Sequence, residues 1–559
     1  MSFANPIRRV GKFFVPLPAS ALRRSADFSA AQIFVMFAVL ALIAAIPIIT
    51  NPLPPLEDYA NHLARMSVIA NVERDTNLSR FYEIHWEIVP NLMMDLSVPS
   101  LVRFINIYVA GQIFLVAIFV LIMSGTLVLH RTLHGRWSVL PLIAFPLLYN
   151  RVFLIGVTNY LFGIGLALWG LAIWIALRER TWPLRLAMGA VFVLALFFCH
   201  LFAVGVYALG LLAYELWRLV SSRRRFSPDT ATRDTDRDTQ EKAWSGRILD
   251  FLATGLPFLL VVPLMLASPI LTHLGGFEWQ SVGKIDGLTF TIEVYSDIVA
   301  FVLTGIVAAA AIWAARHSLL RLHPVGLFVT GVGTLIYLAL PRLLFDTYMA
   351  DQRLPIALAF MLVACVDLDL RQRIVRRTFV AMSLILLLVR VIEVDVAWAP
   401  LSAAALEFKD SVKRIERGSR VLVAYADQTG GDEVGDLGLV HAACLAIIER
   451  SALVTTAFTV EGKQVMHVRQ PYNTQVDTED GTPPSIEQLI VAALRPNPDE
   501  TAYWRAWPQR FDYVYLLFTE DEADNPAPDL LTQVYDGGRF QLYRVGKAHT
   551  AQSAPARGR

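Results

Sequence analysis

The chain has 559 residues, of which 55% are hydrophobic and 17% are charged, and its mean hydropathy is +0.49. Soluble globular proteins carry about 25% charged residues, so this composition excludes a soluble cytosolic enzyme and predicts an integral membrane protein. The formal net charge of +1 gives no basic field for nucleic acid, and three widely spaced Cys argue against a disulfide framework or a zinc site.

Apolar stretches that approach the roughly 20 residues needed to cross a bilayer recur up to about position 398. The first follows a basic tail, 1–30, and is interpreted as a retained span and not as a cleaved signal peptide. We predict about 11 spans, at 31–50, 102–129, 138–149, 152–177, 186–199, 201–219, 248–270, 295–315, 325–341, 355–369 and 378–397.

The distribution of Lys and Arg predicts how these spans are oriented. Basic loops alternate with loops that carry few cations, and basic loops remain in the cytoplasm. They lie at 130–136, 178–185, 218–225, 315–323 and 371–377. The acidic segment 51–101 is therefore expected outside, and the polar segment 220–247 is expected to be a flexible cytoplasmic loop. The pattern favours a multi-pass protein of the bacterial inner membrane with a cytoplasmic N-terminus.

Composition changes near residue 399, where short apolar runs begin to alternate with polar segments. Strands are predicted at 420–426, 452–458 and 511–518, a helix at 437–450, and a hairpin arm at 540–545. The fold class expected is thus an α-helical polytopic membrane domain over 31–398 followed by an extracytoplasmic α/β domain over 399–547. A lid or acceptor-recognition module and a purely structural cap fit this domain equally well. The last residues, 548–559, are expected to be frayed.

Polar side chains gather on the predicted outer face of the membrane domain. Ionisable groups close to a bilayer core are costly, so their presence indicates function or pairing. Segments far apart in the sequence would bring them to one cavity between helices. They are Glu57, Asp58, Asn61, His62, Arg65, Asn150, Arg151, Asn159, Tyr160, His200, Arg342, Asp346, Tyr348, Asp351, Gln352 and Arg353.

The first outer loop begins with PLPPLEDYANHLARM (52–66), whose prolines favour the start of a helix. Asp58, His62 and Arg65 are spaced i, i+4 and i+7, so an amphipathic helix at the interface would present them on one face. The alternative is a carboxylate that only stabilises the helix start and pairs with its neighbour on the same helix.

Two further positions lie at breaks between spans. Asn159 and Tyr160, in GVTNYLFGIG, fall at the outer end of a glycine-rich span, where helix packing and capping explain them at least as well as a pocket does. His200, in FFCHLFAVG, either caps a helical hairpin or lines the cavity.

The segment PRLLFDTYMADQRLP (341–355) combines Arg342 and Arg353 with Tyr348 and Asp351. The planar guanidinium of Arg suits a phosphate. A snorkelling or salt-bridged Arg is the alternative interpretation.

A carboxylate, a nearby His and Arg, and an outward cavity suit the transfer of a sugar from a lipid carrier. The acceptor hydroxyl needs a general base, and the leaving phosphate needs a cation to stabilise its growing charge. The DxD string in VDLDL (366–370) falls at the cytoplasmic end of a span and is interpreted as a coincidence.

These features resemble the GT-C superfamily of polyprenyl-phosphate-dependent membrane glycosyltransferases. The resemblance rests on Glu57-Asp58 directly after the first span, on the many spans and on the outer C-terminal domain. The phrase LEDYANHLAR is also similar to a stretch in uncharacterised bacterial members. It implies that Asp58 is the catalytic base, with Glu57 as its substitute, and that the phosphate-binding Arg is Arg353 or, less securely, Arg342.

The resemblance further implies an inverting transfer from a polyprenyl-phosphate-linked sugar to a glycan or lipid acceptor, among membrane lipids and without nucleic acid. Pocket residues would be His62, Arg65, Asn159, Tyr160, His200, Tyr348 and Asp351. Some relatives use a divalent metal and others do not. Glu57, Asp58, His62 and His85 could supply ligands, but their spacing is not diagnostic, so no metal ligand is assigned.

Two other classes of function stay open at the level of the sequence. A transporter or flippase of lipid-linked or anionic solutes would also need polar groups at the membrane, although no internal repeat is evident. A non-catalytic membrane scaffold or sensor would use the C-terminal domain to bind partners.

Overall fold

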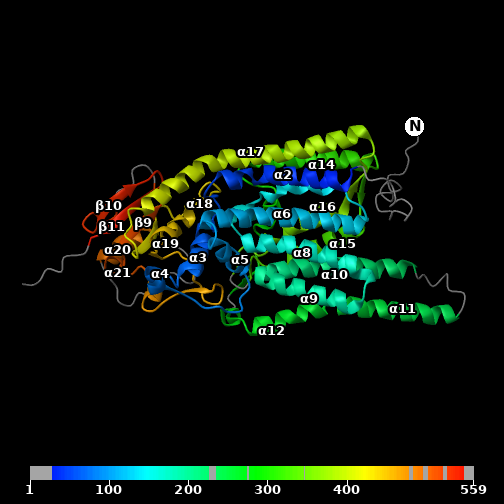
Figure 1. The fold of residues 1–559 in the computed structure, drawn as a ribbon, viewed down its shortest axis with the longest axis horizontal. Coiled ribbons are helices and arrows are strands. Elements are labelled where there is room, and N and C mark those ends of the chain that lie inside the picture. Colours follow the sequence, from blue (N-terminus) through cyan, green and yellow to red (C-terminus); the bar gives the residue numbers. More distant parts are fainter. Residues whose placement is uncertain are drawn as a thin grey trace, which may run out of the picture. The chain divides into compact units, whose positions relative to one another are not determined.

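The computed structural model describes residues 28–225, 234–273, 276–344, 347–476, 483–494, 502–519 and 525–546. Asp346, residues 548–559, most of the tail 1–30 and part of the segment 220–247 lie outside these ranges. The chain divides into two compact units (Figure 1). The first unit comprises Met1–Asn51, Glu87–Ser97 and Gly111–Ala397, and the second comprises Pro52–Trp86, Val98–Ala110 and Trp398–Arg559.

Within the described residues, seven helices are long and apolar enough to cross a membrane. This confirms the expected α-helical polytopic character. They are Ala30–Thr50, Ile107–His134, Thr158–Glu179, Trp182–Cys199, Leu201–Ser221, Trp244–Leu266 and Asp297–Arg316.

The other four predicted spans take different forms. The segment 138–149 forms a 3₁₀ helix, η2 (Leu140–Leu148), and the segments near 325–341 and 355–369 form the shorter helices α15 (Val325–Ala339) and α16 (Leu354–Cys365). The segment 378–397 is part of α17 (Arg373–Val412), a helix of 40 residues that also carries several charges. Hydropathy alone did not distinguish these segments because all four are strongly apolar.

The remaining elements of the first unit are mostly helical, with two short pairs of antiparallel strands, β2–β4 and β3–β5. Helix α5 (Met93–Val102), α6 (Ile107–His134) and α17 contribute residues to both units. The others are α2 (Ala30–Thr50), α7 (Arg151–Ile155), α8 (Thr158–Ala176), η3 (Leu177–Glu179), α9 (Trp182–Cys199), α10 (Leu201–Arg225), α11 (Asp234–Ala253), η5 (Leu256–Leu260), α12 (Val261–Leu266), η6 (Pro269–His273), β2 (Phe277–Glu278), α13 (Lys284–Thr289), α14 (Asp297–Arg316), β3 (Leu320–Leu322), β4 (Leu343–Leu344) and β5 (Val366–Leu368).

The expectation of a flexible loop over 220–247 is wrong for much of that segment. Helix α10 continues to Arg225, and α11 already begins at Asp234. The run QEKA (240–243) within α11 consists of good helix formers, so local propensity outweighs polarity here.

Small residues set the close packing of helices in the first unit. A side chain at Gly163 of α8 would come within 2.5 Å of the Ala203 Cβ on α10. Another at Gly165 would come within 2.9 Å of the backbone of Ile122 on α6. Helices α8, α9 and α10 consequently run side by side (Figure 1).

The second unit is built on a five-stranded sheet with the order β10-β11-β9-β6-β7. Strands β7, β6 and β9 run parallel, and β9, β11 and β10 are joined in antiparallel fashion. The bounds are α3 (Tyr59–Asn71), α4 (Thr76–Phe81), β1 (Tyr82–Ile84), β6 (Arg420–Tyr425), α18 (Leu437–Val440), η7 (Ala442–Cys444), α19 (Leu445–Arg450), β7 (Leu453–Val454), β8 (Met466–Val468), η8 (Tyr472–Gln475), α20 (Ile486–Leu494), α21 (Trp507–Arg510), β9 (Tyr513–Leu517), β10 (Leu531–Asp536) and β11 (Phe540–Val545).

These elements confirm that the C-terminal region contains an α/β sheet. The predicted strands at 420–426, 511–518 and 540–545 are β6, β9 and β11. The predicted strand at 452–458 shortens to the two residues of β7, and the predicted helix at 437–450 is broken into α18, η7 and α19.

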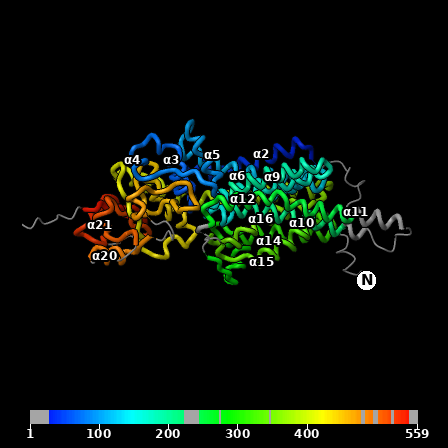
Figure 2. Tube along the Cα trace, turned by 90° about the horizontal axis from the view of Figure 1, so that it is seen from below, coloured from blue at the N-terminus to red at the C-terminus, as the bar shows by residue number. Residues whose placement is uncertain are grey.

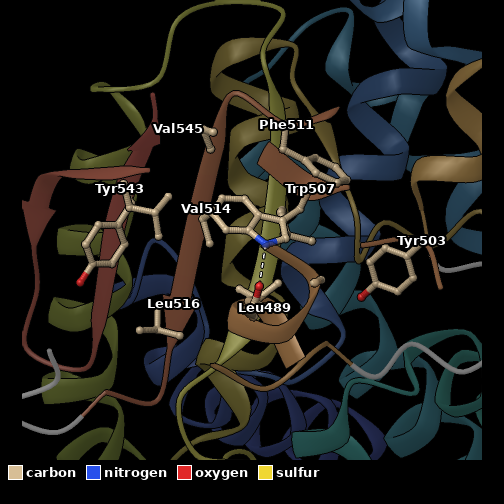
Figure 3. Packing of buried hydrophobic residues seen from close by; sticks show 12 residues of the cluster. Leu489, Tyr503, Trp507, Phe511, Val514, Leu516, Tyr543 and Val545 are labelled. Atoms are coloured by element: carbon tan, nitrogen blue, oxygen red, sulfur yellow. Dashed lines mark hydrogen bonds between the residues drawn. The ribbon is translucent and has the colours of Figure 1, made fainter. Parts of the chain in front are cut away.

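One face of this sheet is covered by aromatic and aliphatic side chains (Figure 3). Trp507 is fully buried between the sheet and α20, and its indole N–H donates to the carbonyl of Leu489 at 2.9 Å. Val514 and Leu516 of β9 contribute to the same cluster. The buried indole therefore has its one polar group satisfied, as a stable core requires.

The second unit also contains Pro52–Trp86, which is part of the segment 51–101 that the sequence analysis placed within the membrane domain as a predicted outer loop. Helix α3 packs on α19, and β1 pairs with β8 in antiparallel register (Figures 1 and 2). Most residues of α3 are buried on every side, including Asn61, His62 and Arg65. The expected amphipathic helix with one open face is therefore a core helix that joins the loop to the C-terminal region.

Candidate functional site

In the second unit, the carboxylate of Asp58 lies at the first turn of α3. Asp58 occupies the N-cap position, but its side chain makes no capping hydrogen bond and is 25% exposed. Its Oδ1 lies 3.6 Å from Nε2 of His441, which follows α18. This distance allows the groups to interact electrostatically but is too long for a direct hydrogen bond. A purely helix-capping role for Asp58 does not fit this geometry.

The protonation pattern of His441 follows from its neighbour Asn61. The Asn61 carbonyl accepts from the Phe458 N–H at 2.9 Å, and its amide nitrogen donates to the Thr456 carbonyl at 2.8 Å. These two bonds fix the orientation of the amide, so the nitrogen that lies 3.3 Å from His441 Nδ1 is a donor. His441 Nδ1 must then be an acceptor, and the ring proton is on Nε2, which faces Asp58.

Burial keeps this ring neutral. Desolvation lowers the pKa of His441 to about 4, because the charged imidazolium would lose its hydration. The ring also packs against Phe458, with centroids 5.0 Å apart. At neutral pH a carboxylate therefore faces a fixed, uncharged N–H donor.

The other predicted residues of this loop have different surroundings. His62 is buried with its ring 5.5 Å from that of Phe458, and Arg65 is 1% exposed. Glu57 lies close enough to Tyr425 to add to the effect of burial, which raises the pKa of that phenol. Asp58 thus combines partial exposure with a histidine neighbour that is itself largely enclosed.

A metal site from the four suggested ligands is not assembled in the described part of the chain. Among the described residues, Glu57, Asp58 and His62 belong to no group of three neighbouring ligand atoms, and His85 does not group with any of them. His85 instead lies 3.4 Å from Glu83 and stacks on His467.

In the first unit, the side chain of Arg353 lies at the start of α16. Its Nη2 donates to the Tyr348 carbonyl at 3.0 Å, and its Nη1 lies 3.4 Å from His200 Nε2. The Tyr160 hydroxyl donates to the Arg353 carbonyl at 2.8 Å, and the Tyr160 ring meets His200 edge-on. Four of the predicted residues, Tyr160, His200, Tyr348 and Arg353, therefore do come together.

The pairing of His200 with Arg353 places two donors face to face. The backbone N–H of Phe202 donates to His200 Nδ1 at 3.2 Å. A neutral His200 then carries its proton on Nε2, directed at the guanidinium, which has only donors. An oxygen of a phosphate can accept from both groups, so this arrangement suits an anion.

Arg342 and Asp351 form a different kind of cluster. Asp351 is fully buried, and it accepts from Arg342 Nε at 2.9 Å and lies 2.8 Å from Lys284 Nζ. Arg342 also donates to the carbonyl of Val282 at 3.0 Å. The cluster ties the loop before α16 to the loop before α13, which is a structural role, so Arg353 is the better candidate for phosphate.

Asn159 also has a structural role, because its side chain hydrogen-bonds to a neighbouring segment. Its amide nitrogen donates to both oxygens of Asn91, and its carbonyl accepts from the Met94 N–H at 2.9 Å. These bonds hold the segment before α5 against α8, which favours the packing interpretation.

The aspartates of the DxD string are also paired. Asp367 accepts two hydrogen bonds from Arg136, at 2.7 and 2.8 Å, and Asp369 accepts from Arg371 Nε at 2.8 Å. Two internally neutralised carboxylates do not make a metal–nucleotide site, in agreement with their interpretation as a coincidence.

Sequence reasoning missed His441 as a site residue. It stands in LGLVHAACLAIIER, where only a single imidazole in an apolar helix distinguishes it. Asp58 and His441 belong to the second unit and Arg353 to the first. The prediction that Asp58 and Arg353 meet therefore stays a prediction.

Comparison with known proteins adds little to this geometry. No family model matches the chain, and no curated protein matches it significantly. Among solved structures it is similar to ArnT from Cupriavidus metallidurans, crystallised bound to undecaprenyl phosphate. The match covers 92% of this chain and 98% of that chain, at 10% sequence identity and a TM-score of 0.49. Because the TM-score is below 0.5, we base the function on this chain's own residues.

Proposed function

We propose that the protein is a membrane glycosyltransferase of the GT-C type, which transfers a sugar from a polyprenyl-phosphate donor to an extracytoplasmic glycan or lipid. The observation that carries the proposal is the partly exposed Asp58 carboxylate beside the fixed N–H of His441. A partly exposed carboxylate of this kind can accept a proton from an acceptor hydroxyl.

In the proposed step, the acceptor oxygen attacks the anomeric carbon while Asp58 takes the hydroxyl proton. The new bond joins the acceptor oxygen to the sugar, and the bond between the sugar and the donor phosphate breaks. Direct displacement inverts the anomeric configuration, and polyprenyl phosphate leaves with the bonding electron pair.

His441 is a positioning residue in this mechanism. Its Nε2–H faces Asp58 Oδ1 and limits the orientations available to the carboxylate. Because burial lowers the pKa of His441 to about 4, this contact joins a carboxylate to an uncharged N–H and is not an ion pair.

Arg353 and His200 are proposed to act on the donor. Their facing N–H groups suit the phosphate of the lipid carrier, whose negative charge grows as the sugar leaves. A guanidinium retains its charge at any physiological pH, so donor binding would not depend on titration of this group.

The test is a transfer assay with the purified full chain. Polyprenyl phosphate carrying a radiolabelled sugar is incubated with lipid and glycan acceptors, and covalent product and free polyprenyl phosphate are both measured. We expect equal amounts of the two products from the wild type and almost none from Asp58→Asn. Movement of intact lipid-linked sugar across vesicle membranes with no covalent product would instead favour a flippase and contradict the proposal.

A further inference from the structure

A patch of exposed apolar side chains lies in the connection between α12 and α14 of the first unit. Val282 and Ile285 are 79% and 76% exposed, although both are aliphatic residues. Large apolar side chains on a water-facing surface are normally scattered singly, so a dense group along one segment marks a contact surface. The apolar patch comprises Phe277, Trp279, Val282, Ile285 and Leu288.

Local structure explains why these side chains are displayed together. Val282, Ile285 and Leu288 recur every third residue across the start of α13, so they lie along one side of that helix. Phe277 and Trp279 are two residues apart in the extended segment that begins with β2, so their side chains point to the same side. Two short elements thus each present an apolar side outward.

The opposite side of α13 is polar and is fixed to the rest of the first unit. Lys284 Nζ donates to the carbonyls of Tyr337 and Leu340 at 3.1 and 2.6 Å. The same ammonium group lies 2.8 Å from the buried carboxylate of Asp351. Gly287 is also buried, and a side chain there would come within 2.5 Å of the Tyr337 hydroxyl. The charge of α13 that is bonded to protein therefore faces inward and its apolar stripe faces outward, which is the reverse of a surface helix in water.

The apolar patch adjoins the apolar surface of α15. The indole N–H of Trp279 donates to the carbonyl of Leu338 at 3.1 Å, close to the end of α15. Leu335 and Leu338 are themselves exposed. A helix that is apolar all round and also exposed faces hydrocarbon. The patch therefore begins where the hydrocarbon-facing side of α15 ends.

A lipid bilayer is the surroundings that fit this arrangement. A short helix at the membrane interface keeps its apolar side among the acyl chains and its polar edge in water. Asp286 supplies such an edge, because it is exposed beside the apolar stripe of α13. Trp is enriched at this depth because its ring is apolar and its N–H is polar, as for Trp279.

The same segment is joined to the loop that carries Arg353. Gln352, which directly precedes Arg353, donates to the carbonyl of Gly283 at 3.2 Å. Arg342, at the other end of that loop, donates to the carbonyl of Val282 at 3.0 Å. The depth at which the apolar patch meets the membrane consequently also sets the depth of Arg353.

We propose that the apolar patch is a membrane-contact surface, which embeds the segment 277–288 at the boundary between lipid head groups and acyl chains. This contact holds the loop with Arg353 at head-group depth, where the phosphate of a lipid carrier lies. The link to donor binding rests on the proposed function, whereas the lipid contact itself does not.

The experiment places a fluorophore on the apolar patch of the full chain in phosphatidylcholine nanodiscs. Ile285→Cys is labelled with bimane, and Leu494→Cys on α20 is the matched control because both side chains are 76% exposed. The three native cysteines are buried, so the introduced thiols are labelled selectively. A doxyl spin label near the top of the acyl chain should quench bimane at position 285 about threefold more strongly than at position 494. Aqueous iodide should show the opposite preference.

A second probe tests the depth of the loop that carries Arg353. Tyr348→Cys lies in this loop, and the Tyr348 carbonyl accepts from Arg353. Bimane at position 348 should be quenched most strongly by a spin label attached to the lipid head group. Quenching by iodide alone would overturn the placement of this loop at head-group depth.

The labelled proteins should keep the wild-type thermal unfolding temperature, which shows that they are folded. Iodide quenching as strong at position 285 as at position 494 would place the patch in water and overturn the proposal. Quenching by neither agent at position 285 would show that protein covers the patch, and would overturn it as well. Lipid quenching in a protein that transfers no sugar would support the membrane contact and contradict only the proposed function.

Discussion

Two polar segments of the sequence look alike, yet the structure gives them different surroundings. At the start of α3, the Asp58 side chain is 25% exposed and lies 3.6 Å from the imidazole of His441. In the loop before α16, Asp351 is fully buried between Arg342 and Lys284. A fully buried carboxylate between two cations maintains structure, whereas a partly exposed carboxylate can be reached by a substrate. Asp58 and Asp351 are the same residue type, so the difference between their expected roles comes from their exposure and their neighbours.

The largest effect is expected when the Asp58 carboxylate is removed. Asp58→Asn should lower kcat about a thousandfold, within the range of a lost general base, and leave the thermal unfolding temperature unchanged. Glu57→Gln, one position earlier, removes the same charge and should lower kcat less than threefold. Steady-state transfer assays and thermal unfolding in detergent check both variants. Equal losses in the two would show that charge alone matters, and not the geometry beside His441.

The opposite pattern is expected at Asp351. Asp351→Asn leaves Arg342 and Lys284 buried without their carboxylate, and should lower the free energy of unfolding by about 3 kcal/mol. Thermal and denaturant unfolding in detergent measure this loss. If the Asp351→Asn protein is stable but its transfer activity is impaired, Asp351 acts in the reaction and does not stabilise the fold.

Substitutions of Arg353 and Arg342 should likewise have different effects, one on donor binding and the other on stability. Arg353→Gln should raise the KM for the lipid-linked donor about thirtyfold, as expected for a lost charged hydrogen-bonding group, with little change in stability. Arg342→Gln breaks the buried bridge to Asp351 and should lower stability instead. Transfer kinetics at varied donor concentration, with thermal unfolding of both variants, decide between them. A wild-type donor KM in Arg353→Gln would show that Arg353 does not bind the donor phosphate.

The smallest effect concerns the pH dependence of stability. The pKa of His441 falls from 6.5 to about 4 on folding, so the unfolded chain binds more protons between these values and stability falls as the pH drops. Between pH 7 and pH 5.5 the loss should be about 1 kcal/mol. His441→Gln should remove this part of the dependence and lower kcat about tenfold. If the free energy of unfolding depends on pH equally in wild type and variant, His441 is not held in the neutral form by burial.

Local patterns in the sequence predicted much of the fold. The apolar runs at 31–50 and 201–219 are spans, and the alternation at 420–426 and 540–545 marks strands of the sheet. These signals are readable because hydrophobic length and period depend only on neighbours along the chain. The apolar residues of η2 and α16 are largely buried, and α15 is apolar but only 15 residues long, so hydropathy alone could not distinguish these segments from the longer helices.

The candidate site was less predictable because its contacts are long-range. Asp58 could be named from its place after the first span, but Asn61 and His441 are 380 residues apart. Nothing in LGLVHAACLAIIER indicates that its histidine meets the first outer loop. The sequence favours Arg353 over Arg342 as the phosphate ligand but does not exclude Arg342, whose structural role is evident only from the buried Asp351 between Arg342 and Lys284.

The most direct test of the central claim, that Asp58 is the base of the transfer, is a single-turnover measurement. Excess enzyme is saturated with labelled lipid-linked sugar, acceptor is added by rapid mixing, and the first-order rate of product formation is followed beside the donor Kd. We predict that Asp58→Asn retains the wild-type donor Kd and loses the transfer rate about a thousandfold. A wild-type rate in this variant would contradict the account.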